Sequence, residues 1–418
     1  MTTIASHSQI LALESAHTSG VYPKRPLAIV RGQGARVWDS QGREYIDCVG
    51  GQGAAILGHA HPALTAAIAH QASQLISCPE IFYNDRRAEL LARLAAVAPP
   101  GLERVFLCNS GAEAVETAIK FARLSTGRPK IIAAMRGFHG RTMGALSATW
   151  KPEYRAGCEP LVPGFYHVPY NDLAALEASL DGESAAVLLE VVQGEGGVHP
   201  AAPGYLSAAA ELCHRAGALL IFDEVQTGFG RTGRLFACEH YGVSPDLMAV
   251  AKGMAGGLPM GACLIGSRVG RLSPLSHGST FGGNPLACAA SLAVLDALMA
   301  EYPHPGSGET LVERSLRLGN ALQQGLRRLP SPLIREVRGL GLMVGVELRV
   351  KVTPVLQRLQ ALGVLALPAG GTVLRFLPPL VIEEGDLERV VAAVGTALEQ
   401  TAAEEHHLVV QGASYVAG

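Results

Sequence analysis

The sequence has no long hydrophobic run and no block of like charge. No segment approaches the roughly 20 apolar residues that cross a bilayer, and the N-terminus, MTTIASHSQILALESAH, lacks a basic start followed by an apolar stretch. The formal net charge is only -2 at pH 7, and no basic face supports nucleic acid or a membrane surface as a partner. We therefore expect a cytoplasmic protein that acts on a small molecule.

Paired cysteines are also missing, and lysine is scarce. The eight cysteines are scattered singly, without a CxxC pair or a Cys/His cluster at metal-ligand spacing. We expect reduced, mostly buried thiols and no metal site. The only lysines are Lys24, Lys120, Lys130, Lys151, Lys252 and Lys351. This scarcity narrows the search for a lysine with a chemical role.

Apolar residues make up 48% of the 418 residues, enough to build large cores and two domains. Between about residues 60 and 300, short apolar runs alternate with helical patterns, which predicts an α/β fold with a mostly parallel sheet between helices. Continuous apolarity is typical of strands covered on both faces. Strands are expected at 104–109, 130–135, 185–191, 218–224, 247–252 and 262–266, and helices at 111–124, 204–215 and 285–299.

The pattern changes after Tyr302, where PHPGSG indicates a turn or linker. A helix at 311–328, two strand-rich segments and a helix at 384–399 predict a smaller α+β domain. Near the N-terminus, RVWDSQGREYIDC is typical of a hairpin that turns at Ser40 to Gly42, and we expect it to join the small domain. The predicted units are 1–60 with the small domain, 61–302 as the large domain, 303–404 as the C-terminal small domain and 405–418 as a frayed tail.

Two charged residues end apolar strands. Asp223 would be costly there unless a positive group meets it, and ligands bind at the carboxyl ends of such strands. Lys252 ends LMAVAK and precedes the uncharged GMAGGLPMG. In apolar surroundings its pKa would fall, so that the free amine could attack a carbonyl. The alternative interpretation is a lysine that extends from the strand end into solvent.

Glycine-rich turns offer two candidate phosphate sites. Ser110, Gly111 and Ala112 follow Asn109 at the start of a helix, where free backbone N–H groups and the helix dipole favour an anion. In HGSTFGGNP, hydroxyl side chains stand beside glycines ahead of another helix. An ordinary capped helix and a simple loop are the alternatives. GFGRTG (228–233) fits GxGxxG, but no clear long helix follows it, so we do not expect a dinucleotide site.

Six motifs occur in a specific order and separation: NSGAEA (109–114), GFHGRT (137–142), QGEGG (193–197), IFDEVQTGFGRTG (221–233), AKG (251–253) and STFGGNP (279–285). In these motifs the sequence resembles the class-III (ω-amino-acid) aminotransferases, which are pyridoxal-phosphate enzymes of fold type I. The resemblance extends from the segment VRGQGARVWDSQGREYID to the segment RFLPPLVI, which is nearly the whole chain. The resemblance implies a large domain around a mostly parallel seven-stranded sheet and a smaller α+β domain.

The resemblance also implies roles around the cofactor. Lys252 would hold pyridoxal phosphate as a Schiff base and move a proton between the substrate carbon and C4′, while Asp223 keeps the pyridine nitrogen protonated so that the ring accepts electrons. Val225 and Phe138 would contact the two faces of the ring, and Gln226 would reach the ring hydroxyl. Glu224 is also implied to be a cofactor-binding residue. The phosphate would be bound by Ser110, Gly111 and Ala112, and by Thr280 from the partner subunit. Taken alone, Phe138 and Val225 would be interpreted as core residues.

Transamination with 2-oxoglutarate requires cations for two carboxylates. Arg141 and Arg375 match the carboxylate-binding positions of the family. Glu195 matches a glutamate that pairs with the second arginine while an ω-amino substrate is bound, and Ser279 is assigned to the substrate site as well. Without the resemblance, we would interpret these arginines as members of ion pairs and Glu195 as a solvated turn residue. Val191 departs from the usual proline of the family, which affects the loop after Glu190.

Within the family, segments 133–150, 334–348 and 375–391 most resemble acetylornithine aminotransferases and their counterparts that act on lysine held by a small acidic amino-group carrier protein. The implied reaction moves the terminal amino group of an N-blocked lysine or ornithine to 2-oxoglutarate, giving a semialdehyde and glutamate in lysine or arginine biosynthesis. A homodimer or a dimer of dimers is expected. Alternatives are an enzyme for N-acetylornithine only, an aminomutase of the glutamate-1-semialdehyde type, and a cofactor-free scaffold.

Overall fold

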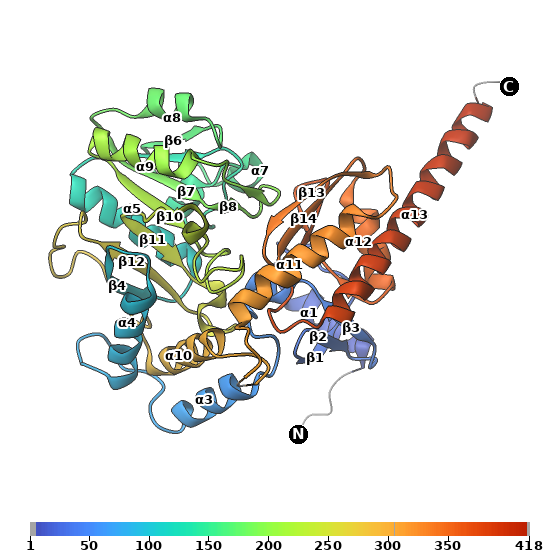
Figure 1. Cartoon of the computed structure of the whole chain (residues 1–418), viewed down its shortest axis with the longest axis horizontal. Helices are drawn as coiled ribbons and strands as arrows, with labels where there is room; N and C mark the ends of the chain where they lie inside the picture. Colours follow the sequence, from blue (N-terminus) through green and yellow to red (C-terminus); the bar gives the residue numbers. More distant parts are fainter. Residues whose placement is uncertain (1–5, 305, 416–418) are drawn as a thin grey trace.

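The computed structural model describes residues 6–304 and 306–415, with side chains up to Glu404. The chain forms two lobes (Figure 1). The larger lobe is built around a seven-stranded sheet, and the smaller lobe contains two four-stranded sheets. The helices of the smaller lobe include α11 (Leu311–Arg327), α12 (Val352–Ala361) and α13 (Glu384–Tyr415). This arrangement confirms the predicted α/β class.

The large sheet has the strand order β4-β12-β11-β10-β7-β5-β6. Its strands are β4 (Leu102–Cys108), β5 (Lys130–Ala134), β6 (Phe165–Val168), β7 (Ser184–Glu190), β10 (Leu219–Asp223), β11 (Leu247–Val250) and β12 (Gly261–Gly266). Only β12 runs antiparallel to its neighbours, so the sheet is mostly parallel as predicted. The sequence analysis missed β6, which is short and only partly buried.

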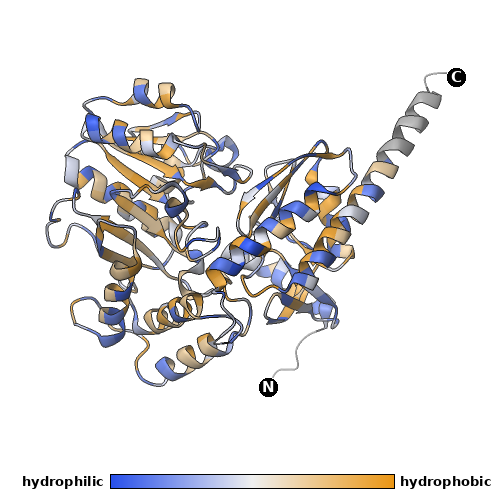
Figure 2. Cartoon of the chain, viewed as in Figure 1, coloured by the Kyte–Doolittle hydropathy of each residue, from blue (hydrophilic) through white to orange (hydrophobic). Residues whose placement is uncertain are grey.

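Side chains of the central strands alternate between two cores. In β10, Leu219 and Ile221 join the core on the side of α5 (Gly111–Thr126), whereas Leu220 and Phe222 join the core that contains residues of α9 (Tyr205–Ala216) and α10 (Pro285–Met299). Figure 2 shows these strands as hydrophobic segments beneath helices. Each fully buried large apolar side chain contributes about 1.5–3 kcal/mol to the free energy of folding. Because both faces of these strands are covered, apolar residues are favoured at every position.

The smaller lobe joins distant parts of the chain. One sheet pairs the N-terminal strands β1 (Ile29–Gln33), β2 (Arg36–Asp39) and β3 (Glu44–Asp47) with β15 (Val364–Leu365), which lies parallel to β3. The other is the antiparallel sheet of β13 (Ile334–Leu340), β14 (Met343–Leu348), β17 (Val373–Phe376) and β16 (Leu367–Ala369). The predicted hairpin at Ser40 to Gly42 is present as β2 and β3, and β3 pairs with β15 in the smaller lobe.

The remaining elements are short or peripheral. They are α1 (His7–His17), α2 (Gly50–Gly53), α3 (Pro62–Ala72), α4 (Asp85–Val97), α6 (Met143–Ala148), α7 (Pro152–Arg155), α8 (Leu173–Ser179), β8 (Val192–Gln193), β9 (His199–Pro200) and the 3-10 helices η1 (Ala237–Tyr241) and η2 (Lys252–Ala255). All eight cysteines are free, and all but Cys78 and Cys158 are buried. No helix in the described part of the chain is both long and apolar enough to cross a bilayer.

Helix α13 differs from its prediction. The sequence predicts a helix that ends near residue 399 and a frayed tail from residue 405, but the helix continues to Tyr415. No proline follows Pro379, and helix-forming residues continue past Gln400, so no local signal stops the helix. Residues 416–418 of the predicted tail lie outside the described residues.

Candidate active site

The carboxyl ends of the large-sheet strands surround a cavity of about 380 Å³. Strands β4, β5, β7, β10 and β11 run in one direction, so the residues that follow them meet at one edge of the sheet. The cavity is lined by Ala54, Asn109, Ser110, Gly111, Ala112, Phe138, His139, Gly140, Arg141, Glu190, Val192, Glu195, Asp223, Val225, Gln226, Thr227, Ala251, Lys252, Gly257, Leu258, Pro259 and Met260. Most of the residues predicted from sequence are therefore brought together.

Lys252 lies in this cavity as the first residue of η2, just beyond the end of β11. Its backbone has φ 40°, a left-handed conformation that costs a non-glycine residue about 1–3 kcal/mol and is common at functional sites. Its amine forms no hydrogen bond or ion pair with any residue described in the structure. Burial lowers the pKa of this amine from 10.5 to about 8; the charge of Glu195 acts in the opposite direction and that of Arg375 in the same direction.

The lowered pKa predicts how capture of an aldehyde depends on pH. At pH 7, a pKa of about 8 leaves about one Lys252 amine in ten uncharged, against about one in 3000 for a lysine at 10.5. The rate at which the cofactor-free enzyme combines with pyridoxal phosphate should rise with pH and level off above about pH 8 to 9. Stopped-flow absorbance measures this rate, and a rate that is still rising at about pH 10 would contradict the lowered pKa.

Asp223 ends β10, and its side chain is only 5% exposed. One carboxylate oxygen accepts a hydrogen bond from the backbone N–H of Val225 (3.1 Å), and the other lies 2.8 Å from Nδ1 of His139. Burial acts to lower the pKa of His139, but the hydrogen bond to Asp223 and the charge of Asp223 raise it above its ordinary value. His139 is therefore the partner of this carboxylate within the fold.

His139 belongs to the GFHGRT motif, but the sequence alone predicts no role for it. Its ring is fully buried, and Nε2 has no hydrogen-bond partner among the described residues. The available signal was a histidine in a turn directly after a buried strand, but its partner lies 84 residues away in the sequence. Only the folded chain identifies that partner.

The N-terminus of α5 forms one end of the cavity. Ser110 is the N-cap residue, and its hydroxyl accepts a hydrogen bond from the N–H of Glu113 (3.2 Å). The N–H groups of Gly111 and Ala112 belong to the first turn, which has no carbonyl partners within the helix. A Cβ at Gly111 would lie 2.6 Å from Cγ1 of Val225, so only glycine allows Val225 to pack this closely. These features favour an anionic group at the helix start.

Phe138 and Val225 both line the cavity, as the predicted ring contacts require. The backbone N–H of Phe138 donates to Oε1 of Glu190 (3.0 Å), and the N–H of Gly194 donates to Oε2 (3.0 Å). Burial raises the pKa of Glu190 to about 7; the charge of His139 opposes this rise and that of Asp223 adds to it. Glu190 therefore connects the two turns on either side of the cavity, even though Val191 replaces the usual proline of the family.

The two predicted carboxylate-binding arginines have different environments. Arg375 on β17 is 2% exposed and donates to Oε1 of Glu195 at 2.6 Å and to Oε1 of Gln226 at 3.1 Å. Arg141 lines the cavity and forms no ion pair with any residue that the structure describes; its guanidinium lies 3.7 Å from the ring centroid of Tyr154. One cation is thus compensated by a carboxylate, whereas the other is available to an anion.

Four predicted site residues do not line this cavity: Arg375, which contacts the cavity residues Glu195 and Gln226, and Glu224, Ser279 and Thr280. The carboxylate of Glu224 is completely buried and accepts hydrogen bonds from Thr227 Oγ1 and from the backbone N–H groups of Ala237 (2.9 Å) and Cys238 (2.8 Å). Ser279 Oγ instead accepts from Nδ2 of Asn109 (3.0 Å), and Thr280 is exposed. The structure thus places Glu224 in the fold behind the cavity, and Ser279 and Thr280 on a neighbouring turn.

Two negative expectations concern nucleotides and metals. The GxGxxG segment forms a turn in which the fully buried Arg231 donates to the backbone carbonyls of Leu342 (3.0 Å) and Pro378. This turn therefore packs against the smaller lobe and does not open a helix. Among the described residues, no three His, Cys, Asp or Glu side chains are grouped so that they could hold a metal ion.

The residues around the cavity fit pyridoxal phosphate. A helix N-terminus with free N–H groups suits its phosphate, the uncharged form of Lys252 suits its aldehyde, and the buried Asp223 suits its pyridinium nitrogen. The cavity volume lies in the range of about 300–1,000 Å³ that is typical of small-molecule sites.

Comparisons with known proteins agree with this fit. The family model "Aminotransferase class-III" matches residues 19–398. The chain is 49% identical over 390 residues to the LysW-aminoadipate semialdehyde transaminase of Deinococcus radiodurans, covering 92% of this chain and 89% of that protein. It is 48% identical over 382 residues to the acetylornithine aminotransferase of Methanopyrus kandleri, covering 90% and 95% of the two chains.

Solved structures give the same result. The ornithine aminotransferase from Toxoplasma gondii has a TM-score of 0.90 at 36% identity, covering 96% of this chain and 97% of that chain. A second structure of that enzyme has partial occupancy of pyridoxal phosphate at its active site, again with a TM-score of 0.90 at 36% identity. Given the family match and a cavity whose residues fit the cofactor, the chain belongs to the class-III aminotransferases and is a pyridoxal-phosphate-dependent aminotransferase.

Proposed function

We propose that the enzyme moves the terminal amino group of an N-blocked lysine or ornithine to 2-oxoglutarate, giving a semialdehyde and glutamate. The observation that carries this proposal is the contrast between Arg141, which has no acidic partner among the described residues, and Arg375, which is paired with Glu195. An ω-amino donor with one free carboxylate needs only Arg141. The second carboxylate of 2-oxoglutarate needs Arg375, which Glu195 must release.

Each residue at the centre of the site has a chemical task. When bound, pyridoxal phosphate supplies an electron sink that stabilises negative charge at the substrate carbon. With the cofactor bound, the Lys252 amine would take a proton from this carbon and return it to the cofactor atom C4′. A pKa near 8 leaves part of the amine uncharged at neutral pH and able to accept the proton. Asp223, which contacts His139, would hold a proton on the pyridine nitrogen. Phe138 and Val225, which both line the cavity, would exclude water from the two faces of the cofactor ring.

Removing Glu195 should change the selectivity for the amino donor. In Glu195→Ala, Arg375 has a permanently free guanidinium, so kcat/KM for the ω-amine should fall relative to that for glutamate by about 10- to 100-fold. Half-reaction rates with each donor measure this ratio. Glu211→Ala, which removes an exposed carboxylate from α9, is the matched control. An unchanged ratio would contradict the proposed exchange of partners at Arg375.

The same assays distinguish the possible donors. One relative is named for LysW-aminoadipate semialdehyde and the other for acetylornithine. Transamination of a terminal amine leaves a semialdehyde, so we propose that the donor is either the corresponding carrier-linked lysine or N-acetylornithine. Lys151 and Arg141, which both lie over the ring of Tyr154, provide positive charge that suits an acidic carrier protein. A strong preference for carrier-linked lysine over free N-acetylornithine identifies the carrier as the partner. Full turnover without 2-oxoglutarate would instead indicate an aminomutase.

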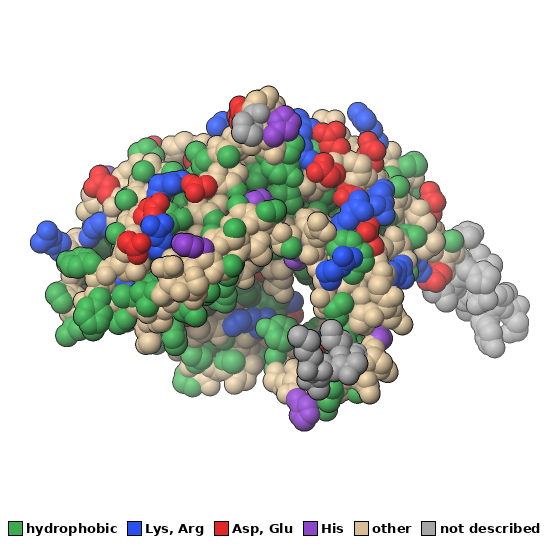
Figure 3. All heavy atoms as spheres, turned by 90° about the horizontal axis from the view of Figure 1, so that it is seen from below, with side chains coloured by type: hydrophobic (Ala, Val, Ile, Leu, Met, Phe, Trp, Pro, Cys, Tyr) green, Lys and Arg blue, Asp and Glu red, His purple; other side chains and the backbone are tan. Residues whose placement is uncertain are grey.

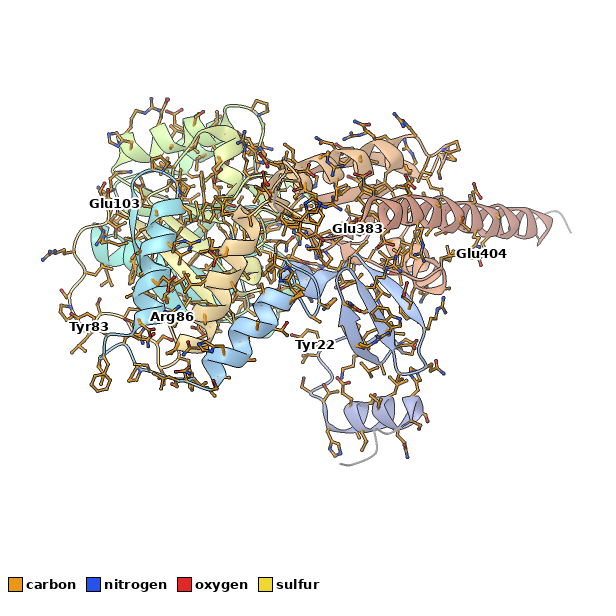
Figure 4. The ribbon with its side chains drawn as sticks, turned by 60° about the horizontal axis from the view of Figure 1, so that its bottom comes forward. Tyr22, Tyr83, Arg86, Glu103, Glu383 and Glu404 are labelled. Carbon is orange, nitrogen blue, oxygen red and sulfur yellow. The ribbon has the colours of Figure 1, made fainter. Side chains whose placement is uncertain are left out.

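We also propose a homodimer, which we expect in the cytoplasm. The segment between α3 and α4 exposes large apolar side chains, namely Leu75, Ile76, Ile81, Phe82 and Tyr83. Figure 3 shows hydrophobic side chains at the outer edge of the large lobe, and Figure 4 places Tyr83 at this edge, far from α13. Such a patch favours an interface between subunits.

The turn that carries Thr280 lies beside this apolar segment. Arg87 is buried and donates from Nε to the carbonyl of Gly283 (2.9 Å) and from a terminal nitrogen to the carbonyl of Phe82 (2.9 Å). The apolar segment and the turn at 279–283 are therefore held together. Thr280 is exposed and does not line the cavity of its own chain, which supports a contact with the cofactor phosphate of a partner subunit.

Charge on this patch should dissociate the dimer. The double variant Phe82→Asp/Tyr83→Asp should sediment as a monomer with weakened cofactor binding, because two buried charges would be costly at an apolar interface. Tyr166→Asp, a change at another exposed tyrosine on β6, is the control that should remain dimeric. Full activity in a monomeric variant would contradict the proposed shared site.

A further inference from the structure

The guanidinium of Arg141 is held by aromatic rings. Its central carbon lies 3.7 Å from the ring centroid of Tyr154 and 5.7 Å from that of Phe138. The two rings contact each other edge to face, with centroids 5.8 Å apart and an interplanar angle of 85°. Tyr154 itself does not line the cavity, whereas Arg141 and Phe138 do. Tyr154 therefore supports two cavity residues from behind.

The backbone fixes Tyr154 in this position. It lies on the short helix α7, which begins with Pro152, and its N–H donates to the carbonyl of Lys151 (3.1 Å). Just before this helix, the N–H of Trp150 donates to the carbonyl of Gly137 (3.0 Å). The hydroxyl of Thr149 accepts from the N–H of His139 (2.9 Å). Segment 149–154 is thus attached to the turn that carries Phe138 and Arg141.

An aromatic ring and a carboxylate have different effects on a neighbouring arginine. Glu195 orients Arg375 but also compensates its charge. The face of the Tyr154 ring attracts Arg141 through its quadrupole and leaves all five N–H donors free for a carboxylate. Stacking also restricts a long side chain that would otherwise lose conformational freedom when it binds a substrate.

We propose that Tyr154 is a positioning residue that holds the Arg141 guanidinium in the direction required to bind a substrate carboxylate. This inference rests on the proposed function of Arg141 as a carboxylate-binding residue. Because Tyr154 acts through Arg141, its loss affects the binding of carboxylate substrates and leaves the chemistry at Lys252 intact.

The test compares three variants of the holoenzyme. Tyr154→Leu should raise the KM for 2-oxoglutarate about 3- to 10-fold and leave kcat at saturation within about twofold of the wild type. Tyr154→Phe retains the ring and should stay within about twofold of the wild-type KM, since the structure shows no hydrogen bond from the hydroxyl to a described residue. Tyr166→Leu is the matched control, because it removes a ring on β6 that also contacts a cation, Nζ of Lys130 at 4.8 Å, but does not line the cavity.

A double-mutant cycle with Arg141→Met separates the two proposals. Once Arg141 is absent, Tyr154→Leu should cause no further rise in KM. If Arg141→Met raises KM and Tyr154→Leu does not, the positioning role is wrong and the carboxylate role of Arg141 stands. If Arg141→Met leaves KM unchanged, the carboxylate assignment itself is wrong. Tyr154→Gln provides a second variant without the ring, and an unchanged KM in this variant would also overturn the positioning role.

Discussion

Replacing Lys252 by alanine should reduce turnover by about 10⁴-fold or more, because the variant loses both the amine that binds the cofactor aldehyde and the group that moves the proton. Steady-state rates with 2-oxoglutarate measure the loss. Borohydride reduction of the holoenzyme, followed by peptide mass analysis, should label Lys252 in the wild type. In the alanine variant no lysine should be labelled.

Lys351→Ala is the control for this experiment. Lys351 is exposed and precedes α12 in the smaller lobe, outside the cavity, so its loss should leave turnover unchanged. The Lys252 amine has no hydrogen-bond or ion-pair partner among the described residues. Its removal should therefore lower the reaction rate without disrupting the folded structure. Substantial turnover in Lys252→Ala, or labelling of another lysine in the wild type, would remove the basis of the assignment.

Asp223→Asn should lower kcat by about 10²- to 10⁴-fold, because asparagine keeps the size of the side chain but removes the charge that holds a proton on the pyridine nitrogen. The same change removes the negative partner of His139, so the pKa of this buried histidine should fall. Measurements of kcat, of cofactor affinity and of the histidine titration by NMR check both effects.

The neighbouring carboxylate provides a stringent control for Asp223. In Glu224→Gln, an amide group meets backbone N–H donors at Ala237 or Cys238, which should lower the free energy of unfolding by about 1–3 kcal/mol. Because Glu224 does not line the cavity, cofactor affinity should remain close to that of the wild type. Thermal unfolding and cofactor titration measure the two quantities. If Glu224→Gln lost the cofactor while Asp223→Asn kept it, the two assignments would have to be exchanged.

Local sequence signals predicted most of the large lobe. The apolar runs of β5, β7 and β10 are buried on both faces, and burial on both faces requires apolar residues at every position. The helix at 285–299 was predicted with the bounds that it has in the structure, because Asn284 caps its first turn and Pro285 begins it. Strand β6 lacked such signals and was missed.

The sequence by itself determined the α/β class, the lysine and the aspartate at strand ends, and the glycine turn at the start of α5, because each depends on residues that are close together in the chain. Only the tertiary structure decided which of these groups meet. The Arg375–Glu195 pair joins residues 180 positions apart, the His139–Asp223 pair spans 84, and Tyr154 reaches Arg141 through the packing of α7. Such contacts depend on the order of strands in the sheet and on the packing of the two lobes. The local propensity of a segment to form a helix or a strand does not determine either.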